Sequence, residues 1–497
     1  MVVKITLKTA EAYIESLRKR RLNIYLFGEQ VKNPVDHPVI RPSINSVAAT
    51  YEVASDPKYE NLATATSHLT GEKINRFTHI HQNIEDLIKK VKLQRILGQK
   101  TGTCFQRCVG WDSLNALSIV TFEMDQKLGT TYYDRFNQYL RYVQENDLVC
   151  CGAMTDPKGD RSLRPSQQAD PDLYLRTVER RDDGIVVRGS KVHQTGGVNS
   201  HEVIVMPTRT MRADDKDYAV SFAVPSDTEG ILYIYGRQSC DTRKLEGVEF
   251  DMGNPKYGGQ EVMIVFDDVF VPLERVFMCG EYEFAWPLVD TFSAYHRQSY
   301  GGCKSGVGDV LIGAAANIAE YNGTAGASSI KDKLVEMNHL NETIYSCGIA
   351  CSSEGCKKPS GTYFVNTLLA NICKHNVTRF PYEIARLAED IAGGLLVTAP
   401  SEKDLKNPKI GKYVEKYLKG VSEYPTEDRL RMLRLIENLT MGLGSVGYRT
   451  ESMHGAGSPQ SQRIMIEREV DMELKKKLAK KIAGIEKEKD ELLEVKK

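Results

Sequence analysis

The hydrophobic pattern of the chain changes its period twice, and this limits the fold more than any other sequence feature. Up to about residue 150, apolar residues recur at helical spacing, as in residues 83–99, where Ile84, Leu87, Ile88 and Val91 form one stripe. Short β-branched runs take over from about residue 151 to 278, and the helical period returns after residue 284. Helices, a β unit and more helices in this order predict an α+β protein.

The β unit is predicted from five runs with intervening turn sequences. The strings DPKGDR, QTGGVNS, PSDTEG and DMGNPKYGG separate runs that are rich in Val, Ile, Tyr and Phe. The runs are Ile185–Val187, Val203–Val205, Tyr218–Val224, Ile231–Tyr235 and Val262–Phe266. This texture predicts an antiparallel sandwich or barrel.

The last part of the chain is predicted to be helical. The long segments lie at about 305–322, 329–350, 378–393 and 427–450, and a tail rich in Lys and Glu begins at Met472, where we expect a solvated helix. A chain of 497 residues is too long for one hydrophobic core. We therefore expect three units: a helical domain at 1–150, a β domain at 151–283 and a second helical domain at 284–497.

Composition excludes several classes of partner. Lys plus Arg equals Asp plus Glu at 66 each, so electrostatics does not favour nucleic acid or an anionic membrane as a partner. No run approaches the ~18 apolar residues that span a bilayer, and the first residues lack the apolar core of a signal peptide. We expect a cytoplasmic protein.

The chain has 11 cysteines, an odd number that a reducing cytoplasm would keep free of a disulfide framework. Most are expected to be small buried hydrophobic residues, among them Cys150, Cys151, Cys240, Cys347 and Cys373.

Two pairs of cysteine and histidine residues could hold a metal. Cys104 and Cys108 form a C-x3-C pair just past the helix at 83–99; if that helix continues, both sulfurs share one face. His296 and Cys303 offer a second pair. Three thiolates and one imidazole suit a cubane iron–sulfur cluster, and zinc is the alternative metal. From spacing alone, an accidental C-x3-C pair remains the simpler interpretation.

Longer motifs resemble a known family. The strings TGTCFQRCVGWD, GAMTDPKGDR, HQTGGVNSHE, YHRQSYGGCKSGVGD, RFPYEIARLAEDIAGG and GYRTESMHGAGSPQ are similar to the 4-hydroxybutyryl-CoA dehydratases. That family belongs to the flavoprotein superfamily of the acyl-CoA dehydrogenases and 4-hydroxyphenylacetate 3-monooxygenases. The resemblance runs from Tyr13 to about Glu469 and implies an acyl-CoA dehydrogenase-like fold, with a helical N-terminal domain, a central antiparallel β domain and a C-terminal helical bundle that forms a homotetramer.

The resemblance also implies two cofactors. It assigns a [4Fe-4S] cluster to Cys104, Cys108, His296 and Cys303, and it places FAD against two loops of the β domain. The flavin-binding residues would be Met154, Thr155, Asp156, Pro157 and Lys158, with His193, Gln194 and Thr195. Without the resemblance these loops would be ordinary turns, although their backbone N–H groups and the lysine suit a pyrophosphate. The segment LAEDIAGG from Leu387 resembles one that reaches FAD from a neighbouring subunit, and no GxGxxG motif supports a Rossmann fold.

The implied reaction removes water from an acyl-CoA substrate, 4-hydroxybutyryl-CoA, to give crotonyl-CoA. The proton lost from C3 is unactivated, so the family is thought to use a radical mechanism in which FAD accepts one electron transiently. The same site would isomerise vinylacetyl-CoA.

The resemblance suggests a role for each polar residue of the site. His296 would be both ligand and base for the C2 proton, Tyr300 would protonate the leaving hydroxyl, and Lys304 would add positive charge. Glu261 and Glu451 would bind the hydroxyl and relay protons, and Gln106 would orient a polar group; His454 is expected to be structural. Packing, capping or simple ion pairing are the alternatives for Tyr300, Lys304 and Glu261.

Three other functions remain open at this stage. A flavin-dependent phenol monooxygenase could use the same scaffold without a cluster, and an iron–sulfur electron carrier would need no paired carboxylates. A zinc-stabilised interaction protein is the third. Colour would separate them, since only the dehydratase combines flavin with broad brown absorbance.

Overall fold

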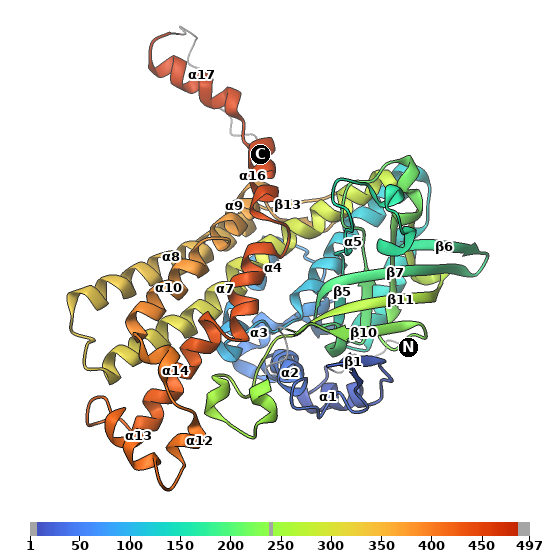
Figure 1. The fold of residues 1–497 in the computed structure, drawn as a ribbon. Coiled ribbons are helices and arrows are strands. Elements are labelled where there is room, and N and C mark those ends of the chain that lie inside the picture. Colours follow the sequence, from blue (N-terminus) through green and yellow to red (C-terminus); the bar gives the residue numbers. More distant parts are fainter. Residues whose placement is uncertain (1–6, 238–241, 486–497) are drawn as a thin grey trace.

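The computed structural model describes residues 7–237 and 242–485. Figure 1 shows the β-sheets on one side of the molecule and the long helices α7, α8 and α10 on the other. No helix in the described residues is both long and apolar enough to cross a membrane.

The first part of the chain is mainly helical. The predicted stripe helix is confirmed as α4 (Ile84–Thr101), which begins where the Asn83 side chain accepts a hydrogen bond from the Asp86 N–H, and Leu87 and Val91 are buried. The other elements are α1 (Ala10–Arg18), α2 (Arg41–Ser55), α3 (Glu60–Ala63), β3 (Thr64–Thr66), β4 (Lys73–Asn75), α5 (Cys108–Leu128) and α6 (Tyr132–Glu145).

The described strands of the central part form two sheets that share one core. The six-stranded sheet contains, in order, β2 (Glu29–Gln30), β1 (Ile24–Leu26), β10 (Ile231–Tyr235), β11 (Glu261–Pro272), β7 (Gly184–Thr195) and β6 (Arg176–Arg181). The four-stranded sheet contains β12 (Val276–Cys279), β9 (Val220–Pro225), β8 (Glu202–Val205) and β5 (Cys150–Ala153). Phe222 of β9 meets Phe266 of β11 edge to face, with ring centroids 6.0 Å apart. All five predicted runs therefore lie on strands of a sandwich.

The prediction that the sandwich is purely antiparallel is wrong in two places. β1 pairs with β10 in parallel, and β5 pairs with β8 in parallel. β1 lies before residue 150 and β5 begins at it, so each of these strands follows a helix. Neither is joined to its parallel partner by a hairpin. The N-terminal segment is thus also part of the six-stranded sheet.

The C-terminal helices pack around a long central helix, α7 (Ala285–Tyr321), which begins about twenty residues before the predicted start at 305. Its middle is buried on every side, so the amphipathic period on which the prediction relied is absent. Gly302 and Gly306 lie against the backbone of α4, where a Cβ at either position would overlap the carbonyl oxygen of Val91 or Arg95. These glycines let α4 and α7 approach closely.

The remaining C-terminal elements follow α7. They are α8 (Ser328–Ser353), β13 (Cys356–Lys357), β14 (Tyr363–Phe364), α9 (Thr367–Val377), α10 (Phe380–Ala392), α11 (Leu395–Thr398), α12 (Glu402–Leu405), α13 (Gly411–Tyr417), α14 (Thr426–Thr440), a π-helical turn (Val446–Thr450), α15 (Glu451–His454), α16 (Pro459–Glu469) and α17 (Met472–Ile482). The predicted helix at 427–450 thus ends ten residues early. α17 extends away from the body and has no buried residue, as predicted for the charged tail.

The cysteines are free throughout the described chain. Cys150, Cys151 and Cys373 are buried as predicted, whereas Cys347 is only half-buried. Cys240 lies outside the described residues.

Candidate active site

The C-x3-C pair does not lie on one helical face. α4 ends at Thr101 because Gly102 adopts a left-handed backbone, with φ of 60°, and Cys104 lies in the loop that follows. Cys108 is the first residue of α5. Between them Gln106 also has a positive φ, 59°, so the chain reverses within the motif. The two cysteines are brought together by this turn and not by helical spacing.

Cys303 approaches these cysteines from α7. Burial raises the pKa of the Cys108 thiol well above its usual range, and the neighbouring Cys104 and Cys303 raise it further. Burial likewise raises the pKa of Cys303, to about 11. Mutual effects of this kind require short distances. The loop of Cys104, the start of α5 and the middle of α7 therefore bring three thiols to one region, with Cys108 and Cys303 buried and Cys104 partly exposed.

His296 lies two helical turns before Cys303 and is held by a carboxylate. Its Nδ1 is 2.8 Å from Oδ2 of Asp112 on α5. The ring stacks on Phe292, with centroids 5.5 Å apart, and meets the edge of the Tyr300 ring at 5.1 Å. These contacts leave Nε2 as the ring nitrogen for a ligand or substrate.

Glu261 and Glu451 meet at one hydroxyl. Thr195 Oγ1 lies 2.8 Å from Oε1 of Glu261 and 3.2 Å from Oε1 of Glu451, while Lys304 Nζ lies 2.7 Å from Oε2 of Glu451. Glu451 follows the π-helical turn, an irregularity frequent at functional sites. The structure thus brings together four residues that the sequence singled out.

The two carboxyl groups have opposite electrostatics. Burial, followed by the charge of Glu451, raises the pKa of Glu261 well above its usual range. Burial opposes ionisation of Glu451 as well, but the Lys304 ammonium lowers the pKa of Glu451 below its usual value. In such a pair Glu261 holds a proton more readily than Glu451 does.

Tyr300 lies between two lysines. Its ring centroid is 5.0 Å from Lys304 Nζ and 4.8 Å from Lys374 Nζ. Its hydroxyl faces Gly455, where a Cβ would overlap the oxygen. The sequence analysis missed Lys374 on α9, since it belongs to none of the motifs. Burial, then the charges of Lys304 and Arg297, lower the pKa of Lys374 to about 7.

Gln106 connects the cysteine loop to the β-sheets. Its side-chain N–H donates to the carbonyl of Gln260 at 2.9 Å, and its carbonyl accepts from Asn199 Nδ2 at 2.9 Å. The side chain therefore ties the loop of Cys104 to the residue before Glu261.

The two predicted flavin loops lie side by side. The Val192 N–H donates to the Thr155 carbonyl at 2.8 Å, which joins the segment 154–158 to the segment 193–195. Lys158 and His193 both have a positive φ, 75° and 59°. Asp156 points inward, where its carboxylate pairs with Lys191 Nζ at 2.9 Å. Its side chain therefore holds the loop in place.

Other motifs are placed as follows. LAEDIAGG forms the end of α10, where Leu387, Ala388 and Ile391 are buried among the C-terminal helices, so its contact with a neighbouring subunit stays a prediction. His454 is exposed at the end of α15.

No three His, Cys, Asp or Glu side chains in the described ranges are arranged to hold one metal ion. The zinc alternative needs such an arrangement, because its ligands surround a single ion at short bonds. A cubane cluster binds each ligand to a different iron and so takes ligands that stand further apart.

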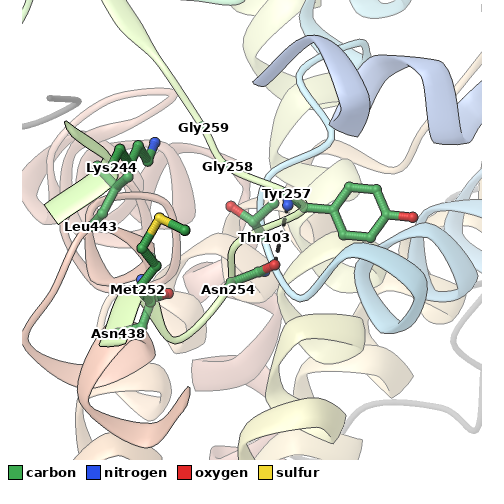
Figure 2. A pocket seen from close by; sticks show the side chains of 10 residues that line it. Thr103, Lys244, Met252, Asn254, Tyr257, Gly258, Gly259, Asn438 and Leu443 are labelled. Carbon is green, nitrogen blue, oxygen red and sulfur yellow. Dashed lines mark hydrogen bonds between the residues drawn. The ribbon is translucent and has the colours of Figure 1, made fainter. Parts of the chain in front are cut away.

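A small pocket adjoins the site (Figure 2). It lies between the loop before β11 and the end of α14, where Asn254 Oδ1 accepts from the Tyr257 N–H at 3.2 Å. A side chain at Gly259 would meet Thr103 and Gln106, which places the pocket beside Cys104. The lining residues, none of them in the predicted site, are Thr103, Lys244, Met252, Asn254, Tyr257, Gly258, Gly259, Asn438, Leu443 and Gly444.

Comparison with known families and structures agrees with this geometry. Residues 9–278 match the family described as 4-hydroxyphenylacetate 3-hydroxylase N terminal, and residues 285–484 match its C terminal counterpart. The oxygenase component of 4-hydroxyphenylacetate 3-monooxygenase from Thermus thermophilus is 27% identical, over 88% of this chain and 89% of that protein. A solved structure of such an oxygenase component, complexed with FAD, has a TM-score of 0.85 at 24% identity, covers 96% of this chain and 98% of that one, and shows a shared fold.

Greater similarity is found to dehydratases. The 4-hydroxybutyryl-CoA dehydratase/vinylacetyl-CoA-Δ-isomerase of Clostridium aminobutyricum is 61% identical over 96% of this chain and 100% of that protein. The structure of an oxygen-tolerant archaeal 4-hydroxybutyryl-CoA dehydratase from N. maritimus has a TM-score of 0.95 at 57% identity and covers 99% of this chain and 98% of that one. The chain therefore belongs to the 4-hydroxyphenylacetate 3-hydroxylase family and, within it, to the group of the 4-hydroxybutyryl-CoA dehydratases, as its motifs predict.

Proposed function

We propose that this chain dehydrates 4-hydroxybutyryl-CoA to crotonyl-CoA and isomerises vinylacetyl-CoA. The observation that carries the proposal is the 61% identity to the bifunctional enzyme of Clostridium aminobutyricum over that protein's whole length. The match covers 96% of this chain, which supports a site of the dehydratase type.

The residues of the site fit the two implied cofactors. Cys104, Cys108 and Cys303 lie in the protein interior, where burial disfavours free thiolates. The positive charge of the cluster irons would stabilise the thiolate form of all three. His296 is oriented by a carboxylate, as metal-bound imidazoles usually are. The two joined loops of the β domain, 154–158 and 193–195, would hold FAD; the fold shared with an FAD-bound oxygenase supports this part of the proposal.

When bound, FAD supplies reversible one-electron chemistry and the cluster supplies a Lewis-acidic iron. Around them, His296 would take the C2 proton at Nε2, which can accept a proton only while this nitrogen is not bound to iron. The resulting imidazolium would donate its Nδ1–H to Asp112, so that its positive charge is balanced within the protein.

We assign to Tyr300 the donation of the proton with which the substrate hydroxyl leaves as water. Burial raises the pKa of Tyr300 well above its usual range. Lys304 Nζ, 5.0 Å from the ring centroid, would offset part of this effect by stabilising the phenolate formed on proton donation. Glu261, as the neutral carboxyl, would donate a hydrogen bond to the substrate hydroxyl, and the ionised Glu451 would fix Lys304 and relay protons. Tyr300 and Lys304 are buried, which would limit the access of water to the reacting atoms.

The alternative functions explain less of the site. A phenol monooxygenase uses no set of three buried thiols with an imidazole, and the similarity to those oxygenases is 27% or lower in the examples above. An electron carrier would leave the pair of Glu261 and Glu451 without a role. We also propose a homotetramer in the reducing cytoplasm, which light scattering of the purified protein would test.

The first experiment is anaerobic purification with iron, sulfide and flavin quantified on the sample used for turnover. We expect about four irons and one FAD per chain, with crotonyl-CoA formed from 4-hydroxybutyryl-CoA. Flavin without iron and without dehydration would overturn the proposal in favour of a monooxygenase, and iron without flavin would favour an electron carrier.

A further inference from the structure

Asp112 on α5 is the centre of a buried polar network that none of the sequence motifs revealed. Its side chain is 0% exposed, and each of its oxygens has a partner. Oδ1 lies 2.5 Å from Lys90 Nζ, and Oδ2 lies 2.8 Å from His296 Nδ1 and 3.1 Å from Ser299 Oγ. Three elements, α4, α5 and α7, thus meet at one carboxylate.

Lys90 is fixed as firmly as Asp112. Its side chain is 0% exposed, and Nζ also donates to the carbonyl of Tyr295 at 3.0 Å. The ammonium lies over the rings of Trp111 and Tyr295, 5.6 and 5.2 Å from their centroids. A buried lysine ammonium costs free energy unless it is paired with an opposite charge. Lys90 therefore keeps Asp112 in its ionised, carboxylate form.

An ionised Asp112 determines the state of His296. A carboxylate only accepts hydrogen bonds, so the Nδ1 that faces it carries the proton. In the neutral imidazole the lone pair is then on Nε2, the nitrogen directed away from Asp112.

We propose that Asp112 is a positioning residue that fixes His296 in the Nδ1–H tautomer with Nε2 toward the reaction centre, and that Lys90 keeps Asp112 in the form that does so. The inference rests on the proposed function, in which His296 is a cluster ligand and base. When Nε2 accepts the C2 proton, Nδ1–H stays donated to Asp112, and no proton passes to the carboxylate.

The two carboxylate oxygens of Asp112 bind different partners, and this arrangement supports the positioning role. Lys90 occupies Oδ1 and His296 occupies Oδ2, so the charge of Lys90 is balanced without competition for the imidazole. Ser299, one turn after Tyr295 on α7, donates to the same Oδ2 and fixes the carboxylate plane. The imidazole is therefore held by a rigid group whether or not it is bound to iron.

The chain contains a matched control. Asp86, also buried, lies 2.9 Å from His79 Nε2 and 2.8 Å from Arg76. This second network has the same three chemical groups, a carboxylate, an imidazole and a cation, but none of its members is a predicted site residue. Substitution of either aspartate by asparagine should lower the melting temperature, and only Asp112 should affect the site.

The test compares Asp112→Asn, Asp86→Asn and wild type as anaerobic holoenzymes. For Asp112→Asn we expect bound iron and flavin at wild-type level, a 10²–10⁴-fold loss of kcat for dehydration and a changed nitrogen coupling in pulsed electron paramagnetic resonance of the reduced cluster. Asp112→Glu, which keeps the carboxylate, should recover part of kcat. Asp86→Asn should match wild type in kcat and nitrogen coupling.

A measurement on wild type keeps the inference testable even if Asp112→Asn fails to fold. Enzyme labelled with ¹⁵N only at histidine Nε2 should show the strong coupling of a metal-bound nitrogen, and enzyme labelled only at Nδ1 should show a weak one. The reverse result, or an active Asp112→Asn with the wild-type kcat and coupling, overturns the positioning role. Wild type without iron and dehydration would instead contradict the proposed function.

Discussion

Glu261 and Glu451 lie side by side in the protein interior, both partly exposed, and accept hydrogen bonds from the same Thr195 hydroxyl, at 2.8 and 3.2 Å. Their pKa values are displaced in opposite directions, upward for Glu261 by burial and by its neighbour, and downward for Glu451, where Lys304 outweighs burial. Two carboxyl groups at this distance do not ionise together easily, and Lys304 decides which of them carries the charge.

The two carboxyl groups should therefore respond differently to amidation. Glu261→Gln replaces a neutral hydrogen-bond donor with another and should keep kcat within about tenfold of wild type. Glu451→Gln leaves the buried Lys304 without its partner, so we expect a loss of about 3 kcal/mol in stability and at least about 10²-fold in kcat. Turnover and thermal denaturation of both variants check this. Equal losses in the two variants would contradict the assignment.

Serine substitution of the three proposed cysteine ligands should separate cluster binding from packing. Cys104→Ser, Cys108→Ser and Cys303→Ser should each lower the iron content well below about four per chain while FAD stays bound. Cys373→Ser is the matched control, because this thiol is also buried, on α9, and should keep its iron. Iron and flavin analysis of the anaerobically purified variants decides the matter. Full iron in Cys108→Ser, or loss of iron in Cys373→Ser, would argue against these ligands.

Local sequence patterns predicted much of the fold. The stripe that includes Leu87 and Val91 predicted α4, and the β-branched runs predicted their strands, because one buried face imposes a period on the sequence. The start of α7 was missed because a helix buried on all sides has no such period. The pairing of β1 with β10 was missed because contacts across 200 residues leave no local signal.

The site residues also divide into those that a local motif reveals and those that only contacts between distant segments reveal. His296, Tyr300, Glu261 and Glu451 were found through motif resemblance, and the structure brings them together. Asp112, although it stands in one of the quoted motifs, and Lys374 were not singled out. Their importance follows from contacts that span 184 residues to His296 for Asp112 and 78 to Ser452 for Lys374, which a linear pattern does not show.

The ion pair of Asp156 and Lys191 should keep the loop at 154–158 ordered and so support flavin binding. Both side chains are 2% exposed, and the Asp156 carboxylate also accepts from the Leu175 N–H at 3.1 Å. Asp156→Ala leaves the buried Lys191 with two backbone carbonyl partners but without its counter-charge. We therefore expect a loss of about 3 kcal/mol in stability and weaker binding of FAD. Thermal denaturation and flavin content after gel filtration measure both effects.

The control for this prediction is Asp268→Ala. It removes an exposed ion pair with Arg188 near the same strands, β7 and β11, and should cost at most about 1 kcal/mol with no loss of flavin. Retention of FAD in Asp156→Ala despite lower stability would show that the loop order does not depend on this pair.

Lys374 should make stability depend on pH in a predictable direction. Its folded-state pKa of about 7, set by burial, lies below the usual value of 10.5, so between these values the unfolded chain carries a proton that the folded chain lacks. Wild-type stability should rise with pH through this window relative to Lys374→Met, by up to about 1.4 kcal/mol per pH unit. Melting temperatures of both proteins from pH 6 to 10 give the difference, with the exposed Lys127→Met as control. A constant difference would mean that Lys374 stays charged in the folded protein.

Gly455 should be required for the position of the Tyr300 hydroxyl. Its φ of −61° is open to any residue, so the need for glycine is steric: a Cβ would overlap the Tyr300 oxygen, and the ring is confined between Lys304 and Lys374. Gly455→Ala should lower kcat by at least about 10²-fold and reduce the melting temperature. Gly326→Ala, where the added methyl meets nothing within 4 Å, should change neither.

A double variant identifies the clash as the cause. Tyr300→Phe removes the oxygen that the new methyl group would meet, so Tyr300→Phe/Gly455→Ala should recover most of the melting temperature lost in Gly455→Ala. It should remain inactive in dehydration, because the proposed proton donor is absent. If the double variant is as unstable as the sum of the single variants, Gly455 acts through another contact, the nearest being the Glu451 carbonyl at 2.9 Å from the added carbon.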